Sequence, residues 1–407
     1  MSLRLRLGLL ILGLVLVPSA SGQEVTVTTI TPEFNASGGV AVGPDGDVYV
    51  ADFGISLPAN GGDTVYRVTP DGATTVFATG FVGASGNAFD AEGNLYQSNI
   101  GAARISKVTP NGDVTTYATT GIVAPVGVAV DTDGNVYNTN CQTPGRISKT
   151  TPQQVTTTFV QSALMSCPNG LTIDDDGNLY TANFSNGNVV KVTPQGEASV
   201  LVTLPGQGGS GNGHLTFANG RLYVNNWLGR VYEVTLDGES RVLAGTGEQG
   251  TQDGPGDQAT FYHPNGISAS VTGDTLYINQ STQIVSGPQL HPNVVRMITN
   301  VHVTVDSEGG EDLGLGIDLH PIRPTPARGQ ADVAFELAEP GLVSLAIVDM
   351  LGRRVVDVLV GEARAAGDHS LALDVDGLAS GVYQVTLDAV IASGRTARAT
   401  RQLVIAR

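Results

Sequence analysis

The fold is decided by the stretch GVAVGPDGDVYVA at residues 39–51. It predicts a short apolar strand, a tight turn at Asp45-Gly46 and a second strand, because Asp and Gly favour the turns that join antiparallel strands. Related segments begin at six glycines spaced 41 to 53 residues apart, a period typical of propeller blades. Each segment carries a tyrosine in its second strand. The glycines are Gly39, Gly86, Gly127, Gly170, Gly213 and Gly266, and the tyrosines are Tyr49, Tyr96, Tyr137, Tyr180, Tyr223 and Tyr277.

Each segment continues beyond its second strand. A third strand follows, as at 66–69, 105–108 and 189–192, and then a turn that begins with Pro and ends with Gly, as at 70–72. Four short strands in each of six segments predict a six-bladed β-propeller at residues 23–305. This is an all-β architecture in which radial repetition leaves only short, protected strand edges.

The sixth segment lacks an obvious fourth strand, whereas a spare strand, VTVTTI at 25–30, precedes the first segment. We therefore expect residues 25–30 to form the outer strand of the last blade and to close the ring by joining the two ends of the propeller. The alternative is VHVTV at 301–305.

The N-terminus reads as an export signal. Arg4 and Arg6 precede an apolar run at 7–17, which is followed by Pro18 and small residues, the layout of a secretory signal peptide at residues 1–22. The run is shorter than the roughly 20 residues that cross a bilayer, so we expect no membrane span in the mature protein. A membrane anchor is the alternative.

The charge balance argues against two classes of partner. The chain has 21 Lys and Arg against 38 Asp and Glu, a formal net charge of −17. Nucleic acid binding needs clustered Lys and Arg, and attraction to anionic membrane surfaces needs the same. The sequence therefore predicts an acidic exported protein that binds no nucleic acid.

The connection at 243–267 carries a family resemblance. It reads LAGTGEQG at 243–250, then Asp253-Gly254, ATF at 259–261 and PNGI at 264–267, and this order resembles the link between NHL-repeat blades. The recurring Asp-Gly-Asn-Leu-Tyr core is similar both to NHL repeats and to SMP-30/gluconolactonase propellers. The resemblance spans residues 25–300 and implies the propeller fold. It does not imply one activity, because related propellers serve as lactonases, lyases and binding platforms.

The tail reads as a second domain. A polar linker at 306–318 precedes six expected strands, which predict a small antiparallel sandwich at residues 319–407. The strands are expected at 331–337, 342–349, 353–360, 369–375, 381–390 and 396–405.

The same tail resembles a sorting domain. VSLAIVDMLGRRV at 343–355 and LASGVY at 378–383 resemble the C-terminal sorting domain of type IX secretion cargo, although HPIRP at 320–324 lacks the usual Asn-Pro. The resemblance implies that residues 319–407 bind the type IX machinery. It also implies a location outside the cell or on its surface, reached through the periplasm and outer membrane.

Polar residues gather where first strands begin and second strands end, at one mouth of the expected channel. Asn140, Asn183 and Asn226 end second strands, and Trp227 follows; we predict that these four bind ligand. A ring of amide oxygens also suits a hard cation such as Ca²⁺. Asn169, Asn212 and Asn265 precede first-strand glycines, and Asn169 matches the metal-ligand position of gluconolactonase-like propellers. The alternative for all six Asn is structural, as turns that hold neighbouring blades together.

Two histidines are the candidate acid–base groups. His214 and His263 lie beside the same mouth, and we predict a catalytic role for them, although no carboxylate partner is evident in the sequence. The repeats of Gly-x-Gly-x-x-Gly at 206–211 and 245–250 open no helix of a βαβ unit, so neither binds a dinucleotide. The Asp-rich stretches at 131–135 and 174–178 lack the last ligand of a calcium loop and fall at hairpins, where we expect turns.

Cys141 and Cys167 are the only cysteines. They fall in mouth loops of neighbouring blades, and an exported protein meets oxidising conditions, so we predict a disulfide between them. Two free thiols are the alternative, and a metal pair lacks further ligands nearby.

The leading hypothesis for function is an exported propeller that binds a glycan, peptide or protein at the channel mouth. The alternative is a Ca²⁺-dependent lactone hydrolase of the SMP-30/gluconolactonase type, in which the three Asn hold the ion. A third possibility is a structural surface protein. The sequence leaves open whether the chain is an enzyme.

Overall fold

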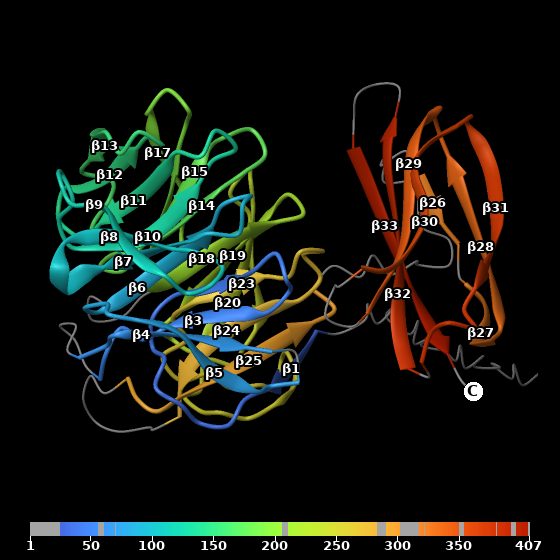
Figure 1. Ribbon diagram of the computed structural model, residues 1–407, viewed down its shortest axis with the longest axis horizontal. Helices are drawn as coiled ribbons and strands as arrows, with labels where there is room; N and C mark the ends of the chain where they lie inside the picture. The colour runs from blue at the N-terminus through green and yellow to red at the C-terminus, as the bar shows by residue number, and fades with distance from the viewer. Residues whose placement is uncertain are drawn as a thin grey trace, which may run out of the picture.

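The computed structural model shows an all-β protein with a six-bladed β-propeller and a small β-sandwich (Figure 1). In Figure 1 the propeller runs from blue to gold and the sandwich from orange to red. The structure describes residues 25–55, 61–69, 71–205, 211–282, 290–301, 317–320, 322–349, 354–379, 381–391 and 396–405. The predicted signal peptide and most of the predicted linker lie outside these residues.

Five blades are four-stranded antiparallel sheets whose strands follow one another in the chain. Blade 1 is β2 (Val40–Val42), β3 (Val48–Ala51), β4 (Thr64–Val68) and β5 (Thr74–Thr79). Blade 2 is β6 (Ala84–Phe89), β7 (Leu95–Asn99), β8 (Arg104–Val108) and β9 (Val114–Ala118). Blade 3 is β10 (Pro125–Val130), β11 (Val136–Asn140), β12 (Gly145–Thr150) and β13 (Thr156–Ser162). Blade 4 is β14 (Pro168–Ile173), β15 (Leu179–Asn183), β16 (Asn188–Val192) and β17 (Ala198–Thr203). Blade 5 is β18 (Asn212–Ala218), β19 (Arg221–Asn226), β20 (Arg230–Thr235) and β21 (Ser240–Ala244).

Blade 6 closes the ring with both ends of the propeller. Its sheet order is β22 (Gly254–Pro255), β1 (Thr26–Thr29), β25 (Asn293–Thr299), β24 (Leu276–Ser281) and β23 (Ile267–Ala269). β1 pairs antiparallel with β25 over four residues, so the predicted closure by the N-terminal strand is confirmed (Figure 1). Of the alternative strand, only Val301 is described, and it bonds Asp274 instead of extending the sheet.

In blades 1, 3 and 4 the recurring tyrosine hydrogen-bonds an Asp of the first hairpin's turn. The Tyr180 hydroxyl donates to Oδ2 of Asp174 at 2.9 Å, and the Tyr49 hydroxyl donates to Oδ2 of Asp45 at the same distance. Asp174 also accepts from the backbone and side-chain nitrogens of Asn178, which confirms that 174–178 is a turn. The phenols are almost fully buried between neighbouring blades. The Asp-Gly-Asn-Leu-Tyr pattern is therefore a hairpin brace.

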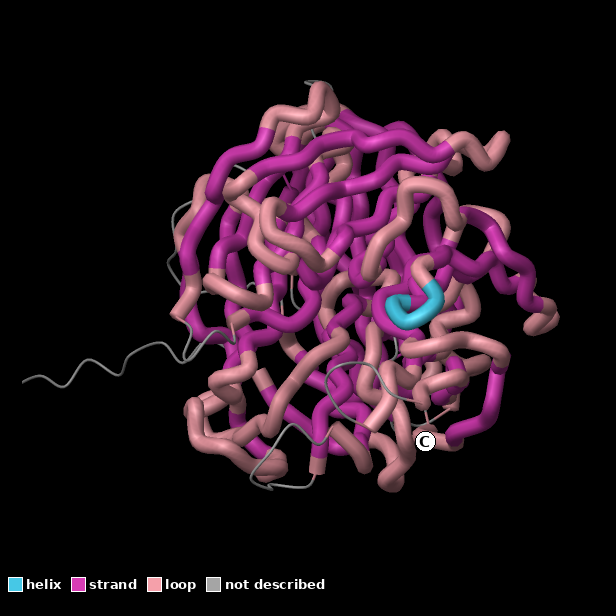
Figure 2. Tube along the Cα trace, turned by 90° about the vertical axis from the view of Figure 1, so that its left-hand side faces the viewer, coloured by secondary structure: helices cyan, strands magenta, loops and turns pink. Residues whose placement is uncertain are grey.

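Helix is nearly absent from the described chain. The described residues contain one 3₁₀ turn, η1 (Ile100–Ala102), drawn cyan in Figure 2. It follows β7 directly and marks the face of the propeller at which second strands end. Among the described residues no helix is long and apolar enough to cross a membrane.

The sandwich packs two sheets around one apolar core, which includes Phe335, Leu345, Val385 and Leu403. All six expected strands are present, and two short ones, β26 and β27, were not predicted. Its strands are β26 (Ile317–Leu319), β27 (Arg323–Arg328), β28 (Gln330–Leu337), β29 (Gly341–Asp349), β30 (Arg354–Arg364), β31 (Gly367–Asp374), β32 (Gly381–Ile391) and β33 (Thr396–Ile405).

Candidate functional site

The six first-strand glycines close around the propeller axis. A Cβ on Gly39 would lie 2.7 Å from Cα of Gly86, and one on Gly86 would lie 2.9 Å from Cα of Gly127. One on Gly266 would lie 2.8 Å from the carbonyl carbon of Gly39, which completes the circle. Real Cβ atoms do not approach backbone so closely. The repeated glycine therefore lets six strands meet at the axis, and we call these residues the glycine ring.

The second-strand asparagines hold the connection that enters their own blade. Nδ2 of Asn183 donates to the carbonyl of Leu164 at 2.8 Å, and Nδ2 of Asn226 donates to that of Pro205 at 2.8 Å. The third, Asn140, accepts at Oδ1 from the backbone of Val123 at 2.8 Å. All three side chains are fully buried. Their arrangement favours the structural alternative, and their binding of a ligand stays a prediction.

The asparagines that precede the glycines are brought together on blades 4, 5 and 6. Nδ2 of Asn169 donates to the backbone carbonyl of Asn212 at 3.4 Å, and Nδ2 of Asn265 donates to that of Ser37 at 2.7 Å. Nδ2 of Asn212 bonds the carbonyl of Gly187, and its Oδ1 accepts from Asn226. The three amides therefore stitch neighbouring blades to one another.

The donor set does not fit Ca²⁺ as it is placed. Calcium takes six to eight oxygens, and its protein sites use carboxylates. Here three neutral amides point their nitrogens at backbone carbonyls, and the oxygen of Asn212 already has a donor. The described residues contain no group of three or more His, Cys, Asp and Glu that could hold a metal ion. We derive no chemistry through calcium at this mouth.

An aromatic cluster lies at the same mouth. Trp227 stacks on His263 with ring centroids 4.6 Å apart and planes 22° apart, and it meets Phe184 edge-on at 5.0 Å. These three side chains are partly exposed and come from the mouth loops of blades 4, 5 and 6. Within the described part of the chain, Nε1 of Trp227 and Nδ1 of His263 have no hydrogen-bond partner. Phe184 was not predicted from the sequence. It directly follows Asn183 as Trp227 follows Asn226, and this shared position in the repeat was the available signal.

The two predicted histidines occupy different places. His263 belongs to the aromatic cluster, where burial lowers its pKa. His214 instead follows the glycine ring inside the channel and lines the axial cavity, with its side chain 6% exposed. Burial lowers the pKa of His214 to about 4. The structure does not combine them in one acid–base site.

The buried His214 predicts a pH dependence of stability. In the unfolded chain a histidine titrates near pH 6.5, so between pH 6.5 and 4 the unfolded state binds more protons than the folded state. The contribution of His214 to the unfolding free energy is therefore fully present above pH 6.5 and falls by about 3 kcal/mol as the pH drops to 4. Urea unfolding of the wild type and of His214→Leu across this range measures the difference. Equal pH slopes for the two proteins would contradict the burial argument.

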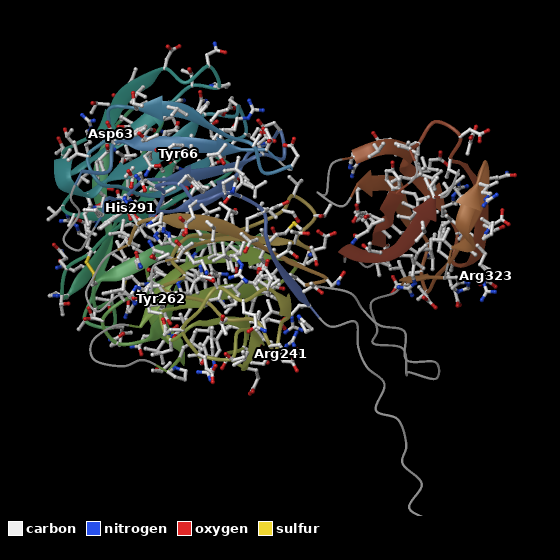
Figure 3. The ribbon with its side chains drawn as sticks, turned by 90° about the horizontal axis from the view of Figure 1, so that it is seen from below. Asp63, Tyr66, Arg241, Tyr262, His291 and Arg323 are labelled. Atoms are coloured by element: carbon white, nitrogen blue, oxygen red, sulfur yellow. A yellow bond between two sulfur atoms is a disulfide. The ribbon has the colours of Figure 1, made fainter. Side chains whose placement is uncertain are left out.

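A histidine–carboxylate pair at the mouth was not predicted from the sequence. Nε2 of His291 lies 2.8 Å from Oδ1 of Asp52, and Oγ of Ser37 lies 3.4 Å from the same nitrogen. All three side chains are largely buried, and His291 and Tyr262 lie on the side of the propeller that carries the disulfide (Figure 3). The available signal was Asp52 itself, a carboxylate at a position where Asn99 and its equivalents are amides. Because Asp52 and Ser37 both reach one ring nitrogen, the trio is not a proton relay through the imidazole.

The predicted disulfide between Cys141 and Cys167 is present. It joins the loop after β11 to the loop before β14, and so links blades 3 and 4 at the mouth. The backbone carbonyl of Cys167 accepts from the backbone nitrogen of Phe184 at 3.0 Å. The bridge therefore braces the chain that carries one ring of the aromatic cluster.

Removal of this bridge by Cys141→Ser with Cys167→Ser is expected to lower the unfolding free energy by about 3 kcal/mol. The cysteines are 26 residues apart, and the bridge restricts the unfolded chain over that loop. Chemical denaturation under oxidising conditions measures the loss. The wild type under reducing conditions is the control and should unfold at the midpoint of the variant; an unchanged variant midpoint would refute the stabilising role.

Solved structures share the fold at low identity. A gluconolactonase from Xanthomonas campestris is 15% identical, with a TM-score of 0.50 over 67% of this chain and 89% of that chain. A protein of unknown function from Bacteroides thetaiotaomicron is 17% identical, with a TM-score of 0.54 over 68% and 76%. An auxiliary nutrient binding protein from Bacteroides ovatus is 16% identical, with a TM-score of 0.53 over 68% and 76%. These likenesses show the fold alone.

Family models match both parts of the chain, whereas no curated protein matches it at a significant level. Residues 321–405 match the secretion system C-terminal sorting domain, which directs the protein by the type IX route to the cell surface or the extracellular space. The resemblance to NHL repeats stays a prediction. Residues 23–243, more than half of the chain, match the virginiamycin B lyase family. On this match, within a confirmed propeller, the chain belongs to the virginiamycin B lyase family.

Proposed function

We propose that this protein is an exported propeller that binds a glycan, peptide or protein at its channel mouth, on the aromatic cluster of Phe184, Trp227 and His263. The observation that carries the proposal is the stack of Trp227 on His263 at 4.6 Å, partly exposed at the mouth. Partly exposed aromatic faces suit sugar rings and peptide side chains, because they offer apolar area on which these groups pack. The sorting domain supports export, because it directs the propeller to the type IX machinery.

The cluster is braced for such a role. The disulfide fixes the segment before Phe184, and the backbone nitrogen of Trp227 donates to the carbonyl of Gly211 at 3.0 Å. The ring of His263 is stacked with Trp227 and with Tyr262, with centroid distances of 4.6 Å and 4.1 Å. Rings held in place before binding lose little conformational entropy when a ligand arrives.

The test is binding of the exported, full-length protein to immobilised glycans and peptides. Trp227→Ala is expected to weaken the strongest wild-type interaction at least tenfold, because a central aromatic side chain contributes more than 1 kcal/mol to a typical interface. Val271→Ala, an exposed residue on the β23–β24 turn, is the control and should bind like the wild type. Equal binding by the Trp227 variant would place recognition elsewhere.

The alternative, a Ca²⁺-dependent lactone hydrolase, is disfavoured by the amide donor set, because its candidate carboxylate, Asp52, is already hydrogen-bonded to His291 and to the backbone nitrogen of Gly54. The pair connects to Asn265 through Ser37. Metal analysis of the purified protein and its thermal midpoint before and after chelation decide this alternative. One tightly held Ca²⁺ whose removal lowers the midpoint would favour the hydrolase, because a ligand selective for the folded state stabilises it.

A further inference from the structure

The axial channel contains a cavity that is separate from the aromatic cluster at the mouth. Its volume is about 240 Å³, and it lies beyond the glycine ring, on the side where first strands end in their hairpin turns. Its walls come from the inner strand of every blade, and none of the aromatic cluster takes part. The lining is Val40, Ala41, Val42, Asn87, Ala88, Phe89, Val128, Ala129, Val130, Leu171, Thr172, Ile173, His214, Leu215, Thr216, Ile267 and Ser268.

The part of the cavity next to the glycine ring is lined by both apolar and polar residues. Each blade contributes the residue that follows its glycine, and four of the six are apolar. The two exceptions are Asn87 on β6 and His214 on β18, from blades 2 and 5, which face each other across a ring of six. The imidazole reaches across the axis, because its Cε1 lies 3.1 Å from the place that a Cβ on Gly86 would take.

Each of these two side chains has one buried polar atom without a partner among the described residues, although Nδ2 of Asn87 donates to the carbonyl of Tyr49 at 3.5 Å. Asn87 is 8% exposed and His214 is 6% exposed. Among the described residues, Oδ1 of Asn87 and Nε2 of His214 have no hydrogen bond. A buried polar group without a partner costs about 1–3 kcal/mol, whereas an apolar side chain in its place costs nothing. Other blades carry Val or Leu at this position. The fold therefore does not need Asn87 and His214 here, and their unpaired polar atoms lower the stability of the propeller.

Among the described residues, no charged side chain lines the cavity. Its other polar side chains are hydroxyls, and two of these serve neighbouring strands: Oγ of Ser268 accepts from the backbone of Val42, and Oγ1 of Thr172 accepts from that of Phe217. His214 is neutral at physiological pH because burial lowers its pKa. An ion would therefore enter this cavity without a counter-charge, at a high desolvation cost.

We propose that this half of the channel is a second binding site, for a small uncharged polyol, with Asn87 and His214 as its two polar contacts. One ligand hydroxyl donates to Oδ1 of Asn87. A second hydroxyl bonds Nε2 of His214, and it suits either tautomer because an O–H both donates and accepts. The carbon skeleton lies against the apolar walls formed by residues such as Val128, Leu171 and Ile267.

Glycerol is the probe for this site, used with the full-length protein. Saturation-transfer NMR detects its binding, and the ¹⁵N shift of the His214 ring reports contact at Nε2. Asn87→Val and His214→Leu introduce residues that other blades carry at the same position, namely Val40, Val128 and Leu171. Each variant is expected to bind glycerol at least tenfold more weakly and to unfold at a midpoint no lower than that of the wild type.

Trp227→Ala separates this site from the mouth and should bind glycerol like the wild type. The proposal is overturned if glycerol leaves the His214 ring shift unchanged, which would mean that the channel holds water alone. It is overturned equally if Trp227→Ala abolishes glycerol binding while Asn87→Val retains it, which would place the polyol at the mouth. Because two channel variants are measured, misfolding of one still leaves the other to decide.

Discussion

Replacing Arg296 by methionine is expected to lower the unfolding free energy of the propeller by about 3–5 kcal/mol. Arg296 lies on β25 and is 0% exposed. Its guanidinium lies 5.1 Å from the ring centroid of Phe261 and ties the long connection between blades 5 and 6 to the closing sheet. Its polar contacts are Asp253 Oδ1 at 2.7 Å, Gln252 O at 2.9 Å, Gln280 Oε1 at 3.0 Å and Thr260 O at 3.1 Å.

Methionine has the length to fill the space but donates no hydrogen bond. The carbonyl of Thr260 and Oε1 of Gln280 would then lose their donor, and each costs its own desolvation, whereas the carbonyl of Gln252 still accepts from the backbone of Thr260. Asp253 would also lose its partner while it still accepts from the backbone of Thr29 on β1. The contact thus links the connection, β25 and the N-terminal strand, so its loss weakens the closure of the ring itself.

Trp227 is the single tryptophan and lies in the propeller, so its fluorescence during denaturation follows that domain. Arg241→Met is the matched control. Arg241 pairs with Glu233 at 2.7 Å but is 63% exposed, and such surface pairs contribute at most about 1 kcal/mol. A loss of less than 1 kcal/mol in the Arg296 variant would show that the closing sheet does not depend on this arginine.

The second large effect is expected at the glycine ring, where Gly127→Val should cost about 4 kcal/mol or more. A Cβ at this position would lie 2.5 Å from the carbonyl oxygen of Asn169 and 2.5 Å from the backbone nitrogen of Leu171. Both atoms are backbone of the adjacent blade, so no side-chain rotation relieves the clash. Overpacking of a tight interior already costs about 1–3 kcal/mol when side chains yield, and here a blade must move.

Unfolding followed by Trp227 fluorescence measures this effect too, with Thr75→Val as the control. Thr75 lies on the outer strand β5 with its side chain in solvent, where a substitution changes stability by about 0.5 kcal/mol or less. If the two variants unfolded at the same midpoint, close approach of strands at the axis would not be the reason for glycine.

Much of the fold could be predicted because its hairpins are specified by residues close together in the sequence. Each first hairpin is specified by a short turn that contains Gly and by the apolar strands beside it; the Asp174 to Asn178 form of the turn occurs in blades 2, 3 and 4. Closure by residues 25–30 followed from counting strands. The short strands β26 and β27 escaped prediction, because neither has the alternation that marks longer strands.

The site was less predictable, because the local sequence around an asparagine in a mouth loop does not show whether its amide binds a ligand or a backbone carbonyl. The sequence indicated which residues reach the mouth, and Trp227, His263 and Asn265 are indeed there. It did not indicate that the amides are turned to neighbouring blades, nor that His214 lies beyond the glycine ring.

By itself, the sequence determined the repeat, the strands, the sorting domain and the disulfide, since each depends on residues near one another in the chain or on a short recurring pattern. Only the tertiary structure decided which side chains meet. Asp52 and His291 are 239 residues apart, and Asn87 faces His214 across the axis only because six blades close into a ring. Contacts of that kind follow from ring closure, and no local pattern carries that information.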